Sequence, residues 1–145
     1  MIGWILQVTQ VALEKFPMTE WNYRFFKPEE FVCPCCDKID MHDDFMRKMV
    51  NLRMASKQEI IINSGFRCSD RNNELGGGKL SAHLEGKAAD IMVVGKNARK
   101  LVGAAEFCGF GGIGINQKGD YNGRFIHVDT ASNLRDRPRP WIWSY

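Results

Sequence analysis

Hydrophobic residues recur along this chain with two different periods, one typical of helices and one typical of strands. Between residues 40 and 55, large apolar side chains return every three or four positions, which predicts a helix with one buried face. The same spacing predicts helices over residues 2–15 and 97–108, and Gly109 is placed to end the second of these. Pro17 disfavours a helical conformation at the preceding residue, so we expect the first helix to stop there.

Shorter apolar runs rich in β-branched residues predict strands. Two of them cover residues 59–64 and 91–94, and a glycine-bordered run at residues 111–116 is predicted to form a hairpin with residues 124–130. The segment FKPEEF predicts a short helical turn beginning at Pro28. Together these elements predict an α+β fold, in which a small and mainly antiparallel sheet packs against helices.

The length and composition indicate one domain. A chain of 145 residues with 44% hydrophobic content supports a single modest core. It shows neither repeats nor a low-complexity linker, and we expect a helical extension at residues 1–25 ahead of a core at residues 26–143. The three glycines at residues 76–78 predict a flexible loop and not a phosphate cradle, because neither a following Lys-Ser/Thr nor a βαβ context is present. A monomer is the expected state.

Charge excludes some functions. A net charge of +3 is too small to indicate nucleic-acid binding; it could favour approach to an anionic cell wall, although a slightly basic soluble surface is the simpler interpretation. No apolar run reaches the ~20 residues of a membrane span. The start of the chain, MIGWILQVTQVALEKF, has neither a basic n-region nor a small-residue cleavage site. We therefore expect an amphipathic helix, no signal peptide, and synthesis in the cytoplasm.

Three residues are candidate ligands of a metal ion. The chain has three histidines, His42, His83 and His127, and the last two lie in the segments SAHLEGKAADIMVV and FIHVDT, the first of which also contains Asp90. Two imidazoles and one carboxylate suit Zn²⁺ with a fourth position open to water. A single histidine is more simply an ordinary core or surface residue. Asp90, however, stands at the start of a predicted buried strand, where a carboxylate needs a partner.

Strand alternation places further chemistry beside the second histidine. Within FIHVDT, it puts Phe125, His127 and Asp129 on one face and Ile126 and Val128 on the other. The carboxylate of Asp129 thus lies on the same strand face as a candidate ligand. Carboxylates in such positions often accept a hydrogen bond from the metal-binding imidazole and orient it.

These segments together carry a family resemblance. The string SGFRCSDRNNELGGGKLSAHLEGKAADI, with GGIGIN and FIHVD downstream, resembles the zinc D-Ala-D-Ala carboxypeptidases and peptidoglycan endopeptidases, and most of all the branch that includes bacteriophage endolysins. The piece HLEGKAADI is also similar to the zinc site of the Hedgehog signalling domain, which shares that fold. The resemblance covers roughly residues 26–143.

The resemblance implies a function for each of five positions. His83, Asp90 and His127 would hold one Zn²⁺ per chain. Arg67 would bind a substrate carboxylate, and Ser81 would hydrogen-bond the substrate backbone. The implied substrate is a peptidoglycan peptide, and the endolysin likeness implies synthesis in a phage-infected host.

The general base departs from the family pattern. Many members carry an acidic residue three positions before the second zinc-binding histidine, and this chain has Arg124 there. Hydrolysis still needs a group that accepts and returns a proton. The candidates are Asp129, which we favour, and Asp120 in the preceding loop, while Glu85 is a third possibility between the first two ligands.

The five cysteines allow three interpretations. Cys33, Cys35 and Cys36 crowd into VCPCCDK, whereas Cys68 and Cys108 are isolated in sequence. They could be reduced thiols, which the odd count and the missing signal favour. They could include a disulfide from Cys33 or Cys36 to Cys68, or form a second metal site, although no second cysteine pair has zinc-ribbon spacing. A covalent tie at Cys68 would also position the neighbouring arginine.

The C-terminal segment RDRPRPWIWSY combines arginines, prolines and aromatics. The simpler interpretation is an extended tail that packs Trp141 and Trp143 onto the domain. The alternative is an aromatic wall of a substrate groove, because the proteins it resembles often end with a tryptophan soon after this strand.

The sequence thus predicts a zinc peptidase that acts on peptidoglycan stem peptides. The substitution at Arg124 keeps open a second hypothesis, a catalytically silent zinc-stabilised binding or virion-structural module. A cysteine-zinc nucleic-acid module is disfavoured, because both its ligand spacing and its basic charge are missing.

Overall fold

The computed structural model describes residues 21–145, so the helix predicted at residues 2–15 lies outside the described residues. Three α-helices, two short 3₁₀ helices and five strands follow one another along this part of the chain. In order they are η1 (Pro28–Glu30), α2 (Asp43–Ser56), β1 (Ile61–Ser64), α3 (Ser69–Glu74), β2 (Ala88–Met92), α4 (Gly95–Phe107), β3 (Gly112–Asn116), η2 (Tyr121–Gly123), β4 (Phe125–Asp129) and β5 (Trp141–Ser144).

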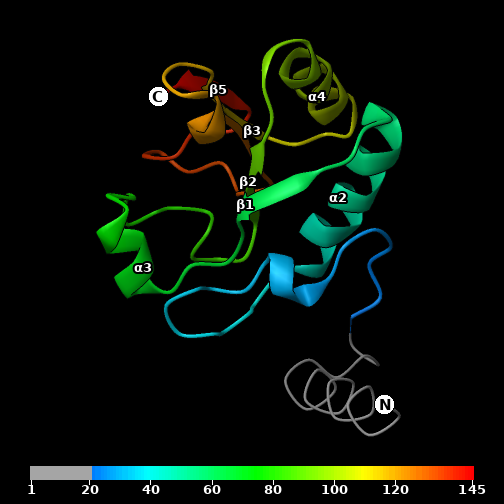
Figure 1. Cartoon of the computed structure of the whole chain (residues 1–145). Coiled ribbons are helices and arrows are strands. Elements are labelled where there is room, and N and C mark those ends of the chain that lie inside the picture. Colours follow the sequence, from blue (N-terminus) through cyan, green and yellow to red (C-terminus); the bar gives the residue numbers. More distant parts are fainter. Residues whose placement is uncertain (1–20) are drawn as a thin grey trace, which may run out of the picture.

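The strands form one sheet in the order β1-β2-β4-β3-β5. The first four are antiparallel to their neighbours, and β5 joins the edge parallel to β3. This confirms the predicted α+β fold with a mainly antiparallel sheet, and it confirms the predicted hairpin of β3 and β4. Figure 1 shows α2 and α4 together on one side of the sheet and α3 on the other side.

The side with α2 and α4 contains the hydrophobic core. The large side chains of both helices meet the apolar residues that alternate along the strands, as expected for a half-buried antiparallel sheet. The buried residues of this layer include Phe45, Met46, Met49, Leu52, Ile91, Ala98, Leu101, Ala105, Ile113, Ile126 and Val128. The apolar face predicted for the helix at residues 40–55 is therefore part of the core.

The same alternation directs polar side chains to the opposite face. Asp90 of β2 pairs in register with His127 of β4, and Ala88 pairs with Asp129. On the other side of β4, Gly114 pairs with His127 and Gly112 with Asp129. The sheet therefore places two predicted metal ligands directly opposite each other, away from the core.

Three sequence expectations differ from the structure. The second strand covers Ala88–Met92 and not residues 91–94, because the two buried alanines at its start pair with β4, so Asp90 lies in mid-strand. The short helix α3 was not predicted, since its six residues SDRNNE carry no apolar repeat. The C-terminal tail forms β5, a regular strand of the sheet.

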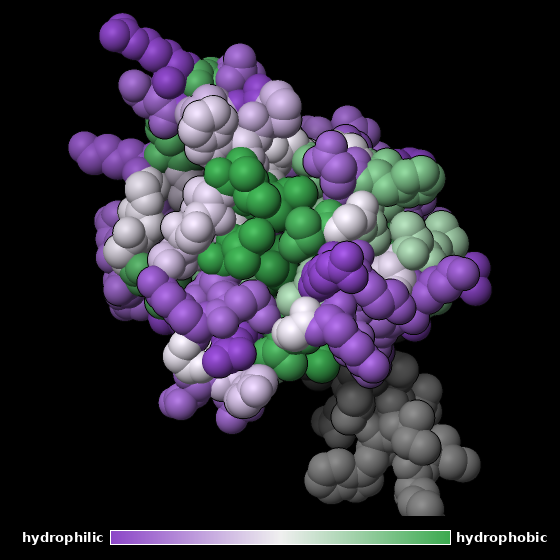
Figure 2. Space-filling view, turned by 90° about the horizontal axis from the view of Figure 1, so that it is seen from above, coloured by the Kyte–Doolittle hydropathy of each residue, from purple (hydrophilic) through white to green (hydrophobic). Residues whose placement is uncertain are grey.

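The remaining surface is mixed. Seen from above, one face shows a central group of hydrophobic side chains surrounded by polar and charged ones (Figure 2). Among the described residues no helix combines the length and hydropathy needed to cross a bilayer. Residues 21–25 contain no helix, and Trp21 and Tyr23 pack against the core.

Candidate metal centre

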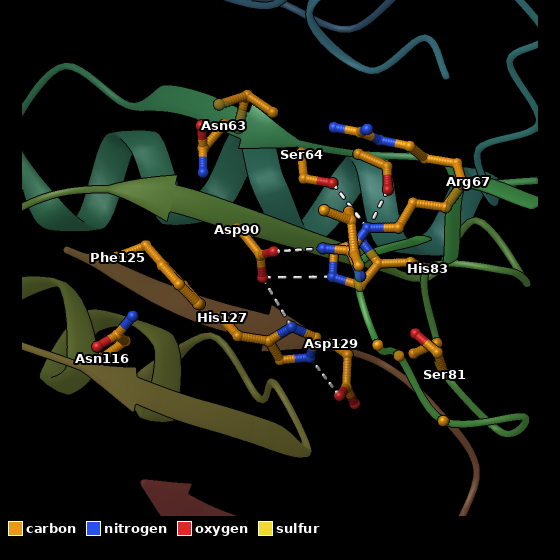
Figure 3. A pocket seen from close by; sticks show the side chains of 18 of the residues that line it. Asn63, Ser64, Arg67, Ser81, His83, Asp90, Asn116, Phe125, His127 and Asp129 are labelled. Carbon is orange, nitrogen blue, oxygen red and sulfur yellow. Dashed lines mark hydrogen bonds and ion pairs between the residues drawn. The ribbon is translucent and has the colours of Figure 1, made fainter. Parts of the chain in front are cut away.

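The three predicted metal ligands converge in space. His83 comes from the loop before β2, Asp90 from the middle of β2, and His127 from the facing position of β4 (Figure 3). All three side chains are buried, and one potential ligand atom from each lies within 4.8 Å of the others. Residues far apart in the sequence thus form one compact group of two imidazoles and one carboxylate.

The spacing of these atoms fits a metal ion. Oδ1 of Asp90 lies 3.3 Å from Nε2 of His83 and 3.0 Å from Nδ1 of His127. A tetrahedral ion bound at about 2.0–2.1 Å holds its ligand atoms roughly 3.3–3.4 Å apart. The two measured separations are therefore close to those of ligand atoms that share one zinc ion.

The orientation of His83 is fixed by a backbone carbonyl. Its Nδ1 lies 2.7 Å from the carbonyl oxygen of Gly65, and a carbonyl can only accept, so Nδ1 carries the proton and Nε2 presents its lone pair to the centre. A side chain at Gly65 would begin 2.7 Å from the Cα of Phe31. Only glycine allows the chain to pass close enough to place this carbonyl behind the imidazole.

The orientation of His127 is fixed by Asp129. Nε2 of His127 lies 2.8 Å from Oδ2 of Asp129, which leaves Nδ1 directed at Asp90. Asp129 is 0% exposed, and its other oxygen accepts a hydrogen bond from the backbone N–H of Ala131 at 3.1 Å. Arg139 reaches the same carboxylate with Nε at 2.9 Å and Nη2 at 2.7 Å. Both carboxylate oxygens are thus engaged.

The pKa shifts agree with this arrangement. Burial lowers the pKa of His83, so its imidazole is neutral and can bind a metal. Burial opposes protonation of His127 as well, but the hydrogen bonds to Asp129 and Asp90 raise its pKa above the ordinary value. Burial would raise the pKa of the Asp90 and Asp129 carboxyls. Hydrogen bonds from His127 to both, from His83 to Asp90 and from Arg139 to Asp129 instead hold each pKa well below its usual range. Asp90 and Asp129 are therefore ionised.

Two glycines of β3 make room for these side chains. A Cβ at Gly112 would overlap the Asp129 carboxylate, and one at Gly114 would lie 2.8 Å from the indole of Trp143. Trp143 instead packs on the His127 ring, with ring centroids 5.0 Å apart. The sequence GGIGIN thus supplies small residues where the ligand-bearing strand needs space.

Arg67 and Ser81 both line the cleft above the ligands. Nη2 of Arg67 donates to Oδ2 of Asp90 at 2.7 Å, and its Nε donates to the Ser64 hydroxyl at 2.9 Å. Arg67 therefore contacts the ligand set in addition to facing the cleft. Ser81 lies two residues before His83, in the loop that forms one cleft wall.

The three predicted proton carriers have different surroundings. Asp129 lines the cleft, with both oxygens engaged as described. Asp120 is exposed at the start of η2 and is not among the residues that line the cleft. Glu85 forms an ion pair with Arg137, a buried residue that lines the cleft. Arg124, at the family's acidic position, donates to the carbonyl of Gly119 at 3.0 Å.

The cleft itself has a volume of about 980 Å³, within the usual range for ligand-binding sites. Parts of its lining come from the loop after α3 and from the C-terminal end of the chain, where Trp143 of β5 packs on His127 and Tyr145 follows the strand. This position agrees with the aromatic-wall interpretation of the tail. The sequence did not point to Gly65 or Arg139, because neither the spacing nor the composition of their segments signals contact with His83 or with Asp129.

The cysteines gather in a second place. Cys33, Cys35, Cys36 and Cys68 lie with one sulfur each within 4.8 Å of the others, whereas Cys108 lies elsewhere. All five are free thiols in the structure. The structure therefore contains no disulfide between Cys68 and either Cys33 or Cys36.

The family model of Peptidase M15 matches residues 24–129, and the chain belongs to this family. M15 peptidases are zinc metallopeptidases that act on peptides, and His83, Asp90 and His127 form a group in this chain that could hold such an ion. No curated protein matches the chain significantly.

Proposed function

We propose that the protein is a zinc-dependent hydrolase of peptide bonds in peptidoglycan stem peptides or cross-links, of the phage endolysin type. The observation that supports this most is the convergence of two correctly oriented imidazoles and one carboxylate at the floor of an open cleft. Membership of Peptidase M15 supports the reaction class. The resemblance of the segment from SGFRC to AADI supports the endolysin type.

The chain's own residues prepare the metal site. His83 would bind through Nε2, His127 through Nδ1 and Asp90 through a carboxylate oxygen, because these atoms face one another in the cleft. A bound Zn²⁺ would supply Lewis acidity, which polarises a carbonyl and lowers the pKa of water toward neutrality. Gly65 and Asp129 would hold the imidazoles in place, so little reorganisation is needed on binding.

Arg67 and Ser81 would position the peptide. The guanidinium of Arg67 is planar and can bind a carboxylate through two parallel N–H groups. In this structure its Nε donates to Ser64 and its Nη2 donates to Asp90. Its Nη1 side remains for a substrate carboxylate at the edge of the ligand set. Ser81 offers one hydroxyl from the loop that precedes His83.

Of the three predicted proton carriers, Asp129 or Asp120 would transfer the proton. Asp129 stands next to His127, and Asp120 stands in the loop before β4. The contacts of Asp129 favour the orientation of His127 as its function, since its oxygens already accept four hydrogen bonds. Separate Asp129→Asn and Asp120→Asn variants assign the proton carrier.

The second candidate is a zinc-stabilised module that binds peptide without cleaving it. Two observations favour it: Arg124 occupies the family's acidic position, and the Asp129 carboxylate is fully engaged. Such a module would keep the metal and the cleft.

Digestion of purified peptidoglycan separates the two candidates. The zinc-loaded protein is incubated with intact sacculi, and the soluble products are identified by mass spectrometry. New peptide termini establish hydrolysis and identify the bond that is cleaved. If sacculi bind the protein but release no peptide, the silent module is the function.

A further inference from the structure

We propose that the chain binds a second zinc ion through the thiolates of Cys33, Cys35, Cys36 and Cys68, separate from the peptidase metal centre. This adds one ion to the single zinc expected from the sequence. The four sulfurs lie within 4.8 Å of one another. Four thiolates are the usual ligand set of a closed structural zinc site, which leaves no position for water.

The measured distances suit a shared metal. Sγ of Cys68 lies 3.7 Å from Sγ of Cys33 and 3.3 Å from Sγ of Cys35. A tetrahedral zinc with bonds of about 2.3 Å separates its sulfurs by roughly 3.8 Å. A disulfide could join only one pair and would leave the other two thiols unexplained. One ion accounts for all four.

The backbone forms the site from two distant segments. The loop of residues 33–38 folds back on itself, because the N–H of Cys33 donates to the carbonyl of Lys38 at 2.8 Å and the N–H of Asp37 to that of Cys33 at 2.9 Å. Cys68 comes from the residue that precedes α3, where its sulfur accepts the N–H of Arg71 at 3.5 Å. Such N–H donation stabilises a thiolate.

The proposed ion would cross-link two segments that contribute residues to the lining of the cleft. It would join the loop after Phe31 to the segment that contains Gly65 and Arg67. The N–H of Phe66 already donates to the carbonyl of Phe31 at 2.9 Å, so the two segments touch next to the sulfurs. The Gly65 carbonyl orients His83, so an ion bound to the nearby thiolates would help to fix the position of that candidate metal ligand.

Zinc stoichiometry tests the proposal. Protein prepared with a reductant is examined by native mass spectrometry and elemental analysis, and we expect two zinc ions per chain. Cys35→Ser and Cys68→Ser should each contain one, whereas Cys108→Ser, which changes the cysteine outside the cluster, should contain two. His83→Ala should also retain one, held by the thiolates.

Cobalt replacement provides a second test, whose decisive sample is the wild-type protein. Co²⁺ bound to thiolates gives near-ultraviolet sulfur-to-metal charge-transfer bands, which a site of histidines and aspartate cannot give. The proposal predicts these bands in the wild-type protein and in His83→Ala. A wild-type chain with one metal ion and no such bands would overturn it, as would an intact mass two hydrogens lighter from a disulfide. Neither outcome depends on peptidase activity, so the failure of either proposal leaves the other standing.

Discussion

Arg139 and Asp129 form a two-point ion pair behind the metal centre. Nε and Nη2 of Arg139 lie 2.9 and 2.7 Å from the two carboxylate oxygens, and Arg139 also lies over the Trp143 ring at 5.0 Å. Since Asp129 in turn holds His127, a residue of the C-terminal segment controls the orientation of a metal ligand. The tail after β4 is therefore part of the cleft that contains the candidate metal ligands.

Replacement of Arg139 should weaken zinc binding. Arg139→Ala removes the two hydrogen bonds that Arg139 donates to the buried Asp129 carboxylate, which orients His127. We expect zinc affinity at the metal centre to fall about 10–100-fold, the usual effect of losing a group that supports a metal ligand. Affinity is measured by competition with a chromophoric chelator in a Cys35→Ser background, so that the thiolates do not contribute. Arg135→Ala, an exposed arginine of the same segment, is the matched control. Equal affinities in the two variants would refute this role.

Asp129→Asn separates orientation from proton transfer. If Asp129 orients His127, the variant binds zinc more weakly and recovers hydrolysis when zinc is raised to saturation. If Asp129 is the general base, zinc affinity is retained and kcat is lost at every zinc concentration. The engaged oxygens lead us to expect the first result. Activity against peptide substrate is measured over a zinc titration.

Gly114 should resist substitution. A Cβ there would lie 2.8 Å from the Trp143 indole, so Gly114→Ala must displace that ring from His127. We expect a loss of about 1–3 kcal/mol in the free energy of unfolding, together with a change in tryptophan fluorescence. Gly103→Ala is the control: it lies in α4 with open space at the Cβ position and should stabilise the helix by about 0.5–1 kcal/mol. Equal effects of the two substitutions in denaturant unfolding would contradict this packing.

Zinc binding should release a proton from His127. Its two carboxylate partners raise its pKa, whereas burial lowers that of His83, so a proton competes with the metal mainly at His127. Because the pKa of His127 is raised, its protonated form is fully present at low pH and disappears as pH rises through that pKa. The affinity for zinc therefore increases with pH over this range. Calorimetry in buffers of different ionisation enthalpy counts the protons, and release that stays at zero from about pH 6 to 8 would contradict the assignment.

Much of the metal site could be predicted from the sequence, because strand alternation and the two histidine segments are local signals. His127 and Asp129 lie on the face that alternation predicts, and Ile126 and Val128 lie in the core. The partners behind the ligands could not be predicted. Gly65 contacts His83 through a backbone carbonyl that any residue possesses, and Arg139 reaches Asp129 only because β5 returns along β3.

The cysteine cluster shows the same limit of local reasoning. Cys35 and Cys68 stand 33 positions apart, and their spacing matches no zinc ribbon. Only the contact between the segments after Phe31 and after Gly65 brings them together. A contact between such distant segments produces no regular spacing in the sequence, so the spacing of the cysteines could not predict which of them come together.

The most direct test of the proposed function is reversible metal dependence of peptidoglycan cleavage. Protein stripped with a chelator, the same protein reloaded with Zn²⁺, and a His127→Ala variant are incubated with sacculi, and the released peptides are quantified by mass spectrometry. The account predicts release by the untreated and reloaded protein only. Equal release by the stripped protein or by His127→Ala, or no release by any sample, would contradict it.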